Sequence, residues 1–150
     1  MARSVQDPAP NLLFRLFVAG QLAGALLGKA IEESGLTPNE FAVLSIIGVY
    51  QPVGPTEVAE RAGMPPTTLS DHVARFEARG LVSRSPNVHD RRSRLLELTE
   101  EGRRCNTIAF EGLLVSNRAI ADRLAVEAET VRSALAELET ALRDVVEPVP

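Results

Sequence analysis

Apolar residues recur with a helical period through the middle of the chain, in two segments separated by a break. In residues 66–79, three apolar side chains stand at i, i+4 and i+7 and form one inward stripe: Leu69, Val73 and Phe76. Pro66 suits the first position of this helix, and Gly80 suits its end. A shorter helical pattern over residues 55–62 precedes it and is broken at Gly63. Two helices joined by a tight turn predict a helix-turn-helix.

The pattern becomes strand-like after Gly80. Residues 81–85 and 94–98 are two short strand-like runs, and the residues between them, 86–92, form a turn-rich, basic loop. This pattern predicts a two-stranded ribbon directly after the second helix, which is the arrangement called a wing.

The N-terminal segment is strongly apolar and is predicted to form a helix from about residue 8 to about residue 34, launched by Asp7 and Pro8. Its uncharged stretch, residues 16–28, is too short to span a bilayer, so we interpret it as a packing helix rather than a membrane segment or a signal peptide. Three glycines lie four residues apart along it: Gly20, Gly24 and Gly28. Glycine costs about 1 kcal/mol relative to alanine in a helix, so this glycine ridge predicts the close approach of another helix, at a subunit contact.

Capping signals open two further helices. Thr37 and Glu40 form a capping box before an apolar helix that ends near Tyr50. Thr99 is a suitable cap for a helix over about residues 100–124. The apolar side chains of that helix are expected to be largely buried: Ile108, Phe110, Leu113, Leu114, Val115 and Ile120.

The last segment carries apolar residues spaced 4, 3, 4 and 3, which is a heptad seam: Val131, Leu135, Leu138, Leu142 and Val145. A seam of this kind requires a partner helix, either from its own chain or from a second one. A lone winged lobe needs neither the glycine ridge nor the seam, so both ends of the chain predict contact with a second subunit. The candidate dimerisation residues are Gly20, Gly24, Gly28, Val131, Leu135, Leu138 and Leu142.

Composition refines this interpretation. The chain has 150 residues, of which 45% are hydrophobic and 24% charged, as in a single globular domain. A net charge of −4 argues at first against nucleic acid, but residues 79–94 hold five arginines against one aspartate, a local charge of +4. The single cysteine, Cys105, excludes an intrachain disulfide and a cysteine-rich zinc site, and it favours a reducing, cytoplasmic setting. We interpret Cys105 as a core residue rather than a redox sensor.

The segment GLVSRSPNVHDRRSRLLELTEEG, residues 80–102, resembles the wing of the MarR family, the multiple-antibiotic-resistance type of transcription regulator. In that family the wing carries Gly-Leu-Val, Asp-x-Arg and Leu-Thr-x-x-Gly, which here are residues 80–82, 90–92 and 98–102. The resemblance implies a mainly α fold with a small β-wing, in a single domain over residues 1–150. It further implies a winged helix-turn-helix lobe over about 37–99, flanked by N- and C-terminal dimerisation helices over about 8–34 and 100–147.

The second helix of the helix-turn-helix, residues 66–79, is the recognition helix. The candidate DNA contacts lie on this helix and on the wing: Thr67, Thr68, Ser70, Asp71, Arg75, Arg84, His89, Asp90, Arg91, Arg92 and Arg94. By resemblance, Arg92 is the arginine that contacts the minor groove, and Asp90 positions the loop. Asp71 departs from the family, in which a basic residue is common near this position. Asp71 either accepts from a cytosine amino group or pairs with Arg75 at i, i+4, and we prefer the second. His72 is interpreted as a partly buried packing residue.

The resemblance implies a homodimer that controls transcription, most often by repression, on a near-palindromic double-stranded DNA site with recognition helices about 10 base pairs apart. In many members a small aromatic or phenolic molecule releases the DNA, and the candidate lining residues here, each also readable as core, are Phe14, Phe17, Phe41 and Phe110. No cofactor and no metal site are expected. An enzyme is disfavoured because the chain lacks a glycine-rich phosphate loop, an HExxH motif and a nucleophile elbow. The alternative is a winged-helix module that binds protein rather than DNA.

Overall fold

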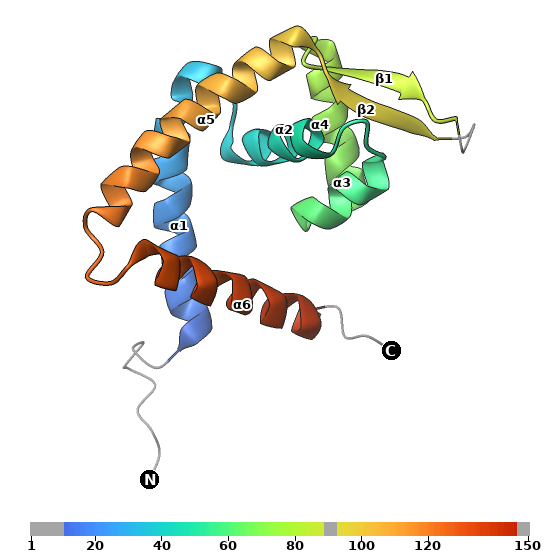
Figure 1. The fold of residues 1–150 in the computed structure, drawn as a ribbon. Helices are drawn as coiled ribbons and strands as arrows, with labels where there is room; N and C mark the ends of the chain where they lie inside the picture. Colours follow the sequence, from blue (N-terminus) through green and yellow to red (C-terminus); the bar gives the residue numbers. More distant parts are fainter. Residues whose placement is uncertain (1–10, 89–92, 147–150) are drawn as a thin grey trace. The chain divides into compact units, whose positions relative to one another are not determined.

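The structure of the protein is a computed structural model that describes residues 11–88 and 93–146 (Figure 1). It is mainly helical with one small antiparallel sheet, which confirms the predicted fold class. The elements in chain order are α1 (Leu12–Ala30), the short 3-10 helix η1 (Glu32–Ser34), α2 (Pro38–Tyr50), α3 (Pro55–Ala62), α4 (Pro66–Ala78), β1 (Val82–Pro86), β2 (Arg94–Leu98), α5 (Glu100–Ala121) and α6 (Ala128–Val146). The chain divides into two compact units with a boundary between Leu113 and Leu114, inside α5.

Proline and glycine set the ends of the two helices of the helix-turn-helix, as the sequence predicted. Pro55 and Pro66 stand in the first turns of α3 and α4. Gly63 ends α3 in the left-handed conformation, with φ of 62°. Gly80, with φ of 68°, follows α4 and donates to the Glu77 carbonyl at 3.0 Å. The next amide, that of Leu81, donates to the carbonyl of Phe76 at 2.8 Å, so α4 ends in a Schellman motif.

The wing is an antiparallel pair of strands in which Val82 faces Leu98 and Pro86 faces Arg94. Its strands match the predicted runs closely. A feature that the sequence analysis missed is Val53, just before α3, which exchanges two backbone hydrogen bonds with Leu96 at 3.2 and 2.8 Å. These bonds tie the wing to the start of the helix-turn-helix.

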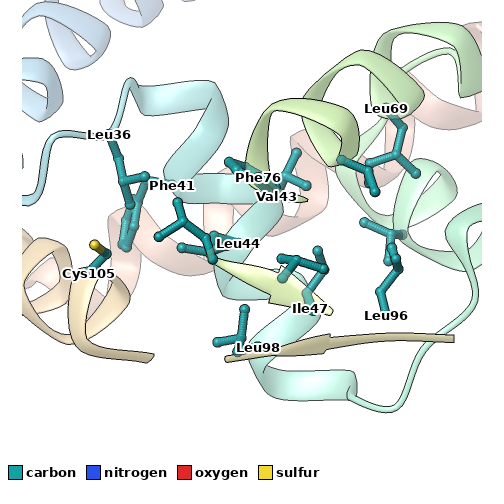
Figure 2. Packing of buried hydrophobic residues seen from close by; sticks show 14 of the residues in the cluster. Leu36, Phe41, Val43, Leu44, Ile47, Leu69, Phe76, Leu96, Leu98 and Cys105 are labelled. Carbon is teal, nitrogen blue, oxygen red and sulfur yellow. The ribbon is translucent and has the colours of Figure 1, made fainter. Parts of the chain in front are cut away.

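The hydrophobic core lies between α2, α4 and the sheet, and α5 closes one side of it (Figure 2). The predicted inward stripe of α4 is confirmed, because Leu69, Val73 and Phe76 are all at most 2% exposed. Leu44 and Ile47 of α2 are completely buried against it. The capping box at the start of α2 is present, with Thr37 and Glu40 bonded to each other's backbone amides.

The prediction that the apolar side chains of α5 are largely buried is wrong for the single chain. Phe110 is 50% exposed and Val115 68%, while the buried positions are Gly102, Cys105 and Ala109. These three residues form a narrow stripe toward the core, and Leu113 is half-buried against it. The other exposed large apolar side chains of α5 are Leu114 and Ile120.

Two glycines bring the backbone of α5 very close to other elements of the first unit. A Cβ atom at Gly102 would overlap the carbonyl oxygen of Leu81, at the entrance to the wing. A Cβ atom at Gly112 would overlap the carbonyl oxygen of Ala30, the last residue of α1. Thr99 caps α5 as predicted, accepting from the Gly102 amide at 3.0 Å.

α1 begins at Leu12, with the side chain of Asn11 accepting from the Phe14 amide, and it ends at Ala30 rather than near residue 34. The predicted launch at Asp7 and Pro8 lies outside the described residues. The chain leaves α1 through η1, which ends at Gly35, where φ is 68°. By length and hydropathy, α1 is the one helix of the described chain that would reach across a bilayer, a criterion that packing helices and signal sequences also meet.

Within the described residues of the first unit, little packs against the glycine ridge of α1. A Cβ atom at Gly20 or Gly24 would meet none of their heavy atoms within 4 Å, and one at Gly28 would only touch Pro38 at 3.9 Å. The large apolar residues of this helix are exposed as well: Leu12, Leu13, Phe14, Phe17, Val18, Leu22 and Leu26.

In the second unit, α6 has no fully buried residue. Two residues of the predicted seam, Leu135 and Val145, are 47% and 79% exposed, and Val131, Leu138 and Leu142 are half-buried. The seam therefore has no fully buried residue.

Candidate nucleic-acid interface

The outer face of α4 is polar, as the sequence predicted. Thr67, Thr68, Ser70, Asp71 and Arg75 are all exposed on it. The hydroxyl group of Ser70 donates to the Pro66 carbonyl at 3.0 Å, which leaves its oxygen available as an acceptor. This face has the donors and acceptors that reading base edges requires.

Arg75 does not pair with Asp71, so the preferred interpretation of Asp71 as its buttress is wrong. The Nε of Arg75 lies 3.7 Å from Oε1 of Glu40, and its Nη2 lies 2.8 Å from Nδ1 of His72. The guanidinium group turns toward α2 because a buried carboxylate there attracts it more strongly than the solvated carboxylate of Asp71.

Glu40 stands at the centre of this arrangement and is only 8% exposed. Burial by itself raises the pKa of Glu40, but hydrogen bonds with Thr37 and the charges of Arg79 and Arg75 outweigh it and hold the pKa below 4.5. Glu40 is thus charged at neutral pH. From the sequence alone, Glu40 is recognisable only as a capping residue.

His72 is 6% exposed and stacks on Phe76, with ring centroids 6.2 Å apart. Burial and the positive charge of Arg75 lower its pKa from 6.5, against the carboxylates of Glu40 and Asp71, which raise it. His72 is therefore a neutral packing residue at pH 7, which confirms that part of the prediction.

Arg84, a candidate DNA contact on β1, is engaged with the recognition helix. Its Nε and Nη2 donate to the two carboxylate oxygens of Glu77 at 2.7 and 3.0 Å. These hydrogen bonds raise the pKa of Arg84 above its ordinary value. A bidentate pair has fixed geometry, so Arg84 braces the wing against α4.

A hydrogen bond joins the two chain segments next to the ends of the wing strands: the side-chain amide nitrogen of Asn87 donates to the Ser93 hydroxyl at 2.8 Å. Arg94, the first residue of β2, is exposed. The remaining candidate contacts of the wing lie outside the described residues: His89, Asp90, Arg91 and Arg92.

The candidate ligand-lining phenylalanines do not share one environment. Phe41 is 6% exposed and belongs to the core, next to Leu36 (Figure 2). Phe14, Phe17 and Phe110 are 50–64% exposed. Within residues 11–88 and 93–146, no cluster of three or more histidine, cysteine or carboxylate side chains is placed to hold a metal ion.

Cys105 packs in the core beside Phe41 and Leu36 (Figure 2) and is 7% exposed. Burial and the nearby carboxylate of Glu101 raise its pKa above 9.0, although Arg104 opposes them. A protonated, buried thiol reacts slowly, so the geometry fits the structural interpretation of this cysteine.

The sequence profile of the MarR family matches residues 34–93, which include the helix-turn-helix and much of the wing. The crystal structure of a probable transcriptional regulator from Pseudomonas aeruginosa is 30% identical and superimposes with a TM-score of 0.80, over 88% of this chain and 99% of that one. The chain belongs to the MarR family.

Other MarR-family comparisons agree. The chain is 33% identical over 95 residues to the HTH-type transcriptional repressor MdtR of Bacillus subtilis, over 63% of this chain and 59% of the repressor. It spans about three fifths of the length of the curated relatives it matches. The regulator MosR of M. tuberculosis, in complex with DNA, is 25% identical with a TM-score of 0.77, over 89% of this chain and 97% of that one. The matched relatives are transcriptional regulators, a non-enzymatic class, as the resemblance implied.

Proposed function

We propose that this MarR-family chain is a sequence-specific regulator of transcription that binds double-stranded DNA as a homodimer and acts as a repressor. One observation carries the proposal: α3 and α4 form a helix-turn-helix, and a two-stranded wing follows it directly. In such an arrangement the second helix enters the major groove and the wing reaches an adjacent groove. The similarity to MosR, whose structure holds DNA, and to the repressor MdtR supports it.

The charges of the lobe support specific rather than tight binding. The chain carries −4 overall, yet residues 79–94 carry five arginines and one aspartate. Arg84 is already paired with Glu77, so it contributes orientation more than phosphate contact. We therefore expect weak binding to arbitrary DNA and a modest dependence of affinity on salt. Arg92 at the wing tip is the proposed minor-groove contact.

The homodimer is supported by the apolar surface that one chain leaves open. α1 exposes large hydrophobic side chains along most of its length, the outer face of α5 exposes several, and α6 exposes Leu135, Val145 and Val146. A row of large exposed apolar side chains such as that on α1 is typical of an interface. A two-fold axis through it would present two α4 helices to one near-palindromic site, with half-sites about 10 base pairs apart.

The proposal includes a small-molecule effector that binds beside α1 and α5. Phe14 and Phe17 of α1 and Phe110 of α5 are exposed aromatic side chains that a small aromatic or phenolic molecule would contact. Phe41 lies in the core and would join such a site only if its neighbours moved. A ligand would release DNA only if it favoured one arrangement of the two lobes over another. We place the protein in the cytoplasm, where Cys105 stays reduced.

The test is fluorescence anisotropy with labelled duplexes, chosen by random-sequence selection on the purified protein, across a salt series. We expect saturable binding that exceeds binding to a scrambled duplex and weakens with salt. Arg92→Ala should abolish the preference, while Arg104→Ala, a change at an exposed arginine of α5, should not. If selection enriches no sequence, the DNA-binding proposal fails and a protein-binding winged helix takes its place.

A further inference from the structure

Glu40 is a buried carboxylate whose two oxygens contact different partners, a backbone amide and a pair of arginines. Its Oε2 accepts from the Thr37 amide at 2.9 Å and so caps α2. Its Oε1 lies 3.7 Å from Arg75 Nε and 3.5 Å from Arg79 Nη1, and both arginines belong to the recognition helix or its cap. The side chain of Glu40 thus connects the N-terminus of α2 to α4, the helix proposed to read DNA.

The two arginines are held by further contacts. Arg79 Nη2 donates to the Gly35 carbonyl at 2.9 Å, in the turn between η1 and α2. Arg75 Nη2 lies 2.8 Å from the ring of His72, which is buried and stacked on Phe76. Each guanidinium group therefore has two partners within the protein, and Glu40 is the partner that they share.

The capping role does not explain why this residue is charged. A glutamine at the same position completes a capping box equally well, because its side-chain oxygen also accepts a hydrogen bond. Burying a carboxylate is costly unless cations offset the cost. The side chain of Glu40 is 10% exposed, and the cations beside it are Arg75 and Arg79. The negative charge therefore points to a role toward these arginines.

We propose that Glu40 is a positioning residue for DNA recognition, which fixes Arg75 in one orientation on α4 and holds Arg79 away from the phosphate backbone. The proposal rests on the DNA-binding function proposed above. An arginine held by internal partners reaches only the DNA atoms that its fixed geometry allows. A free arginine binds any phosphate within reach, and this adds affinity without sequence preference. Glu40 thus lowers the affinity for arbitrary DNA and raises the ratio of the affinity for the specific site to the affinity for arbitrary DNA.

The test is Glu40→Gln, which keeps the hydrogen bond to the Thr37 amide and removes the charge. We expect binding to a scrambled duplex to tighten several-fold, and the ratio of selected to scrambled affinity to fall. The slope of log affinity against log salt should steepen by about 1 to 2, because each newly contacted phosphate adds roughly 0.9. A loss of structure alone would weaken both affinities together, so the two explanations differ in sign.

The matched control is Glu57→Gln. It makes the same charge change on the same lobe, and Glu57 also pairs with an arginine, Arg61, at 2.8 Å on α3. If Glu57→Gln changes the discrimination ratio and the salt slope as much as Glu40→Gln does, the effect is one of net charge and the proposal is overturned. Thr37→Ala is the control for capping: it removes the hydroxyl half of the box and should lower stability without changing the ratio.

Arg79→Gln completes the design. In the wild-type background it should leave binding to the scrambled duplex within about twofold, since Arg79 is held by Glu40 and Gly35. In the Glu40→Gln background, Arg79→Gln should remove about half of the increase in the salt slope that Glu40→Gln causes. A tenfold loss from Arg79→Gln alone would show that Arg79 already contacts phosphate and would overturn the proposal, even if Glu40→Gln did not fold.

Failure of the inference is distinguishable from failure of the proposed function. If the wild-type protein prefers no selected duplex, the DNA-binding function itself fails. If the wild-type protein discriminates and Glu40→Gln discriminates equally well with an unchanged salt slope, only the role of Glu40 is refuted.

Discussion

The glycine ridge of α1 gives the sharpest prediction about assembly, because the expected effect of one substitution changes sign with the oligomeric state. A Cβ atom at Gly24 would meet no heavy atom of the described residues within 4 Å. In an isolated chain, Gly24→Ala and Gly24→Leu should therefore each stabilise the helix, by a little under 1 kcal/mol. If a second subunit packs on the ridge, the added atoms instead overpack the interface.

Overpacking a close contact costs about 1–3 kcal/mol. Since 1.4 kcal/mol is tenfold in an equilibrium constant, the dimer dissociation constant should rise roughly 5-fold to 150-fold, and more for leucine than for alanine. Sedimentation equilibrium over a range of protein concentrations measures that constant, and urea denaturation at low and high concentration separates chain stability from assembly. A Gly24→Leu protein that is more stable and dimerises as tightly as wild type would refute the ridge as a subunit contact.

Three further predictions concern the lobe. Gly80→Ala should lower the free energy of unfolding, measured by urea denaturation, by roughly 1–2 kcal/mol, because φ at Gly80 is 68°. No described neighbour within 4 Å would add a clash, so an unchanged free energy would contradict the Schellman end of α4. Cys105 should react with a thiol reagent at pH 8 at least tenfold more slowly in the folded than in the urea-denatured protein, since burial raises its pKa; equal rates would show an accessible thiolate. Both His72 and Glu40 have pKa values lowered by folding, so their contributions to stability are present above 6.5 and 4.5 and are lost as pH falls through the folded values. Denaturation at a series of pH values should show less acid sensitivity below pH 4.5 in Glu40→Gln; an unchanged profile would argue against a lowered pKa.

The helix-turn-helix was predictable because its boundaries depend on local chemistry. Pro66 and Gly80 act through their own backbone geometry, and the stripe that includes Phe76 depends only on spacing. The capping box of Thr37 with Glu40 and the cap that Thr99 provides for α5 are equally local. For such features the neighbouring residues in the sequence are also the neighbours in space.

The orientation of Arg75 was not predictable, because its partner Glu40 lies 35 positions earlier in the chain and on another helix. Helical spacing offered Asp71 at i, i−4, but the folded protein offered a carboxylate with less solvent around it. The bridge between Val53 and Leu96 was missed for a similar reason, since a single residue pairing with a distant strand leaves no periodic signal.

The exposed face of α5 shows a different limit. Its apolar residues were expected to be largely buried because the helix carries many of them. A period states which side of a helix is apolar but not which chain covers it, and Phe110 and Val115 are uncovered in the monomer. The same reasoning applies to α6, whose seam has no fully buried residue.

The two close contacts of α5 have a consequence for how this chain can vary over evolutionary time. At Gly102 and Gly112 the helix backbone lies directly against the carbonyl groups of Leu81 and Ala30. These points are ten residues apart on one helix, which is a span of about 15 Å. Backbone sets that interval, so changes to the surrounding side chains leave it intact. α5 therefore fixes the distance between the end of α1 and the start of the wing. This distance should be kept in related chains even where most side chains differ.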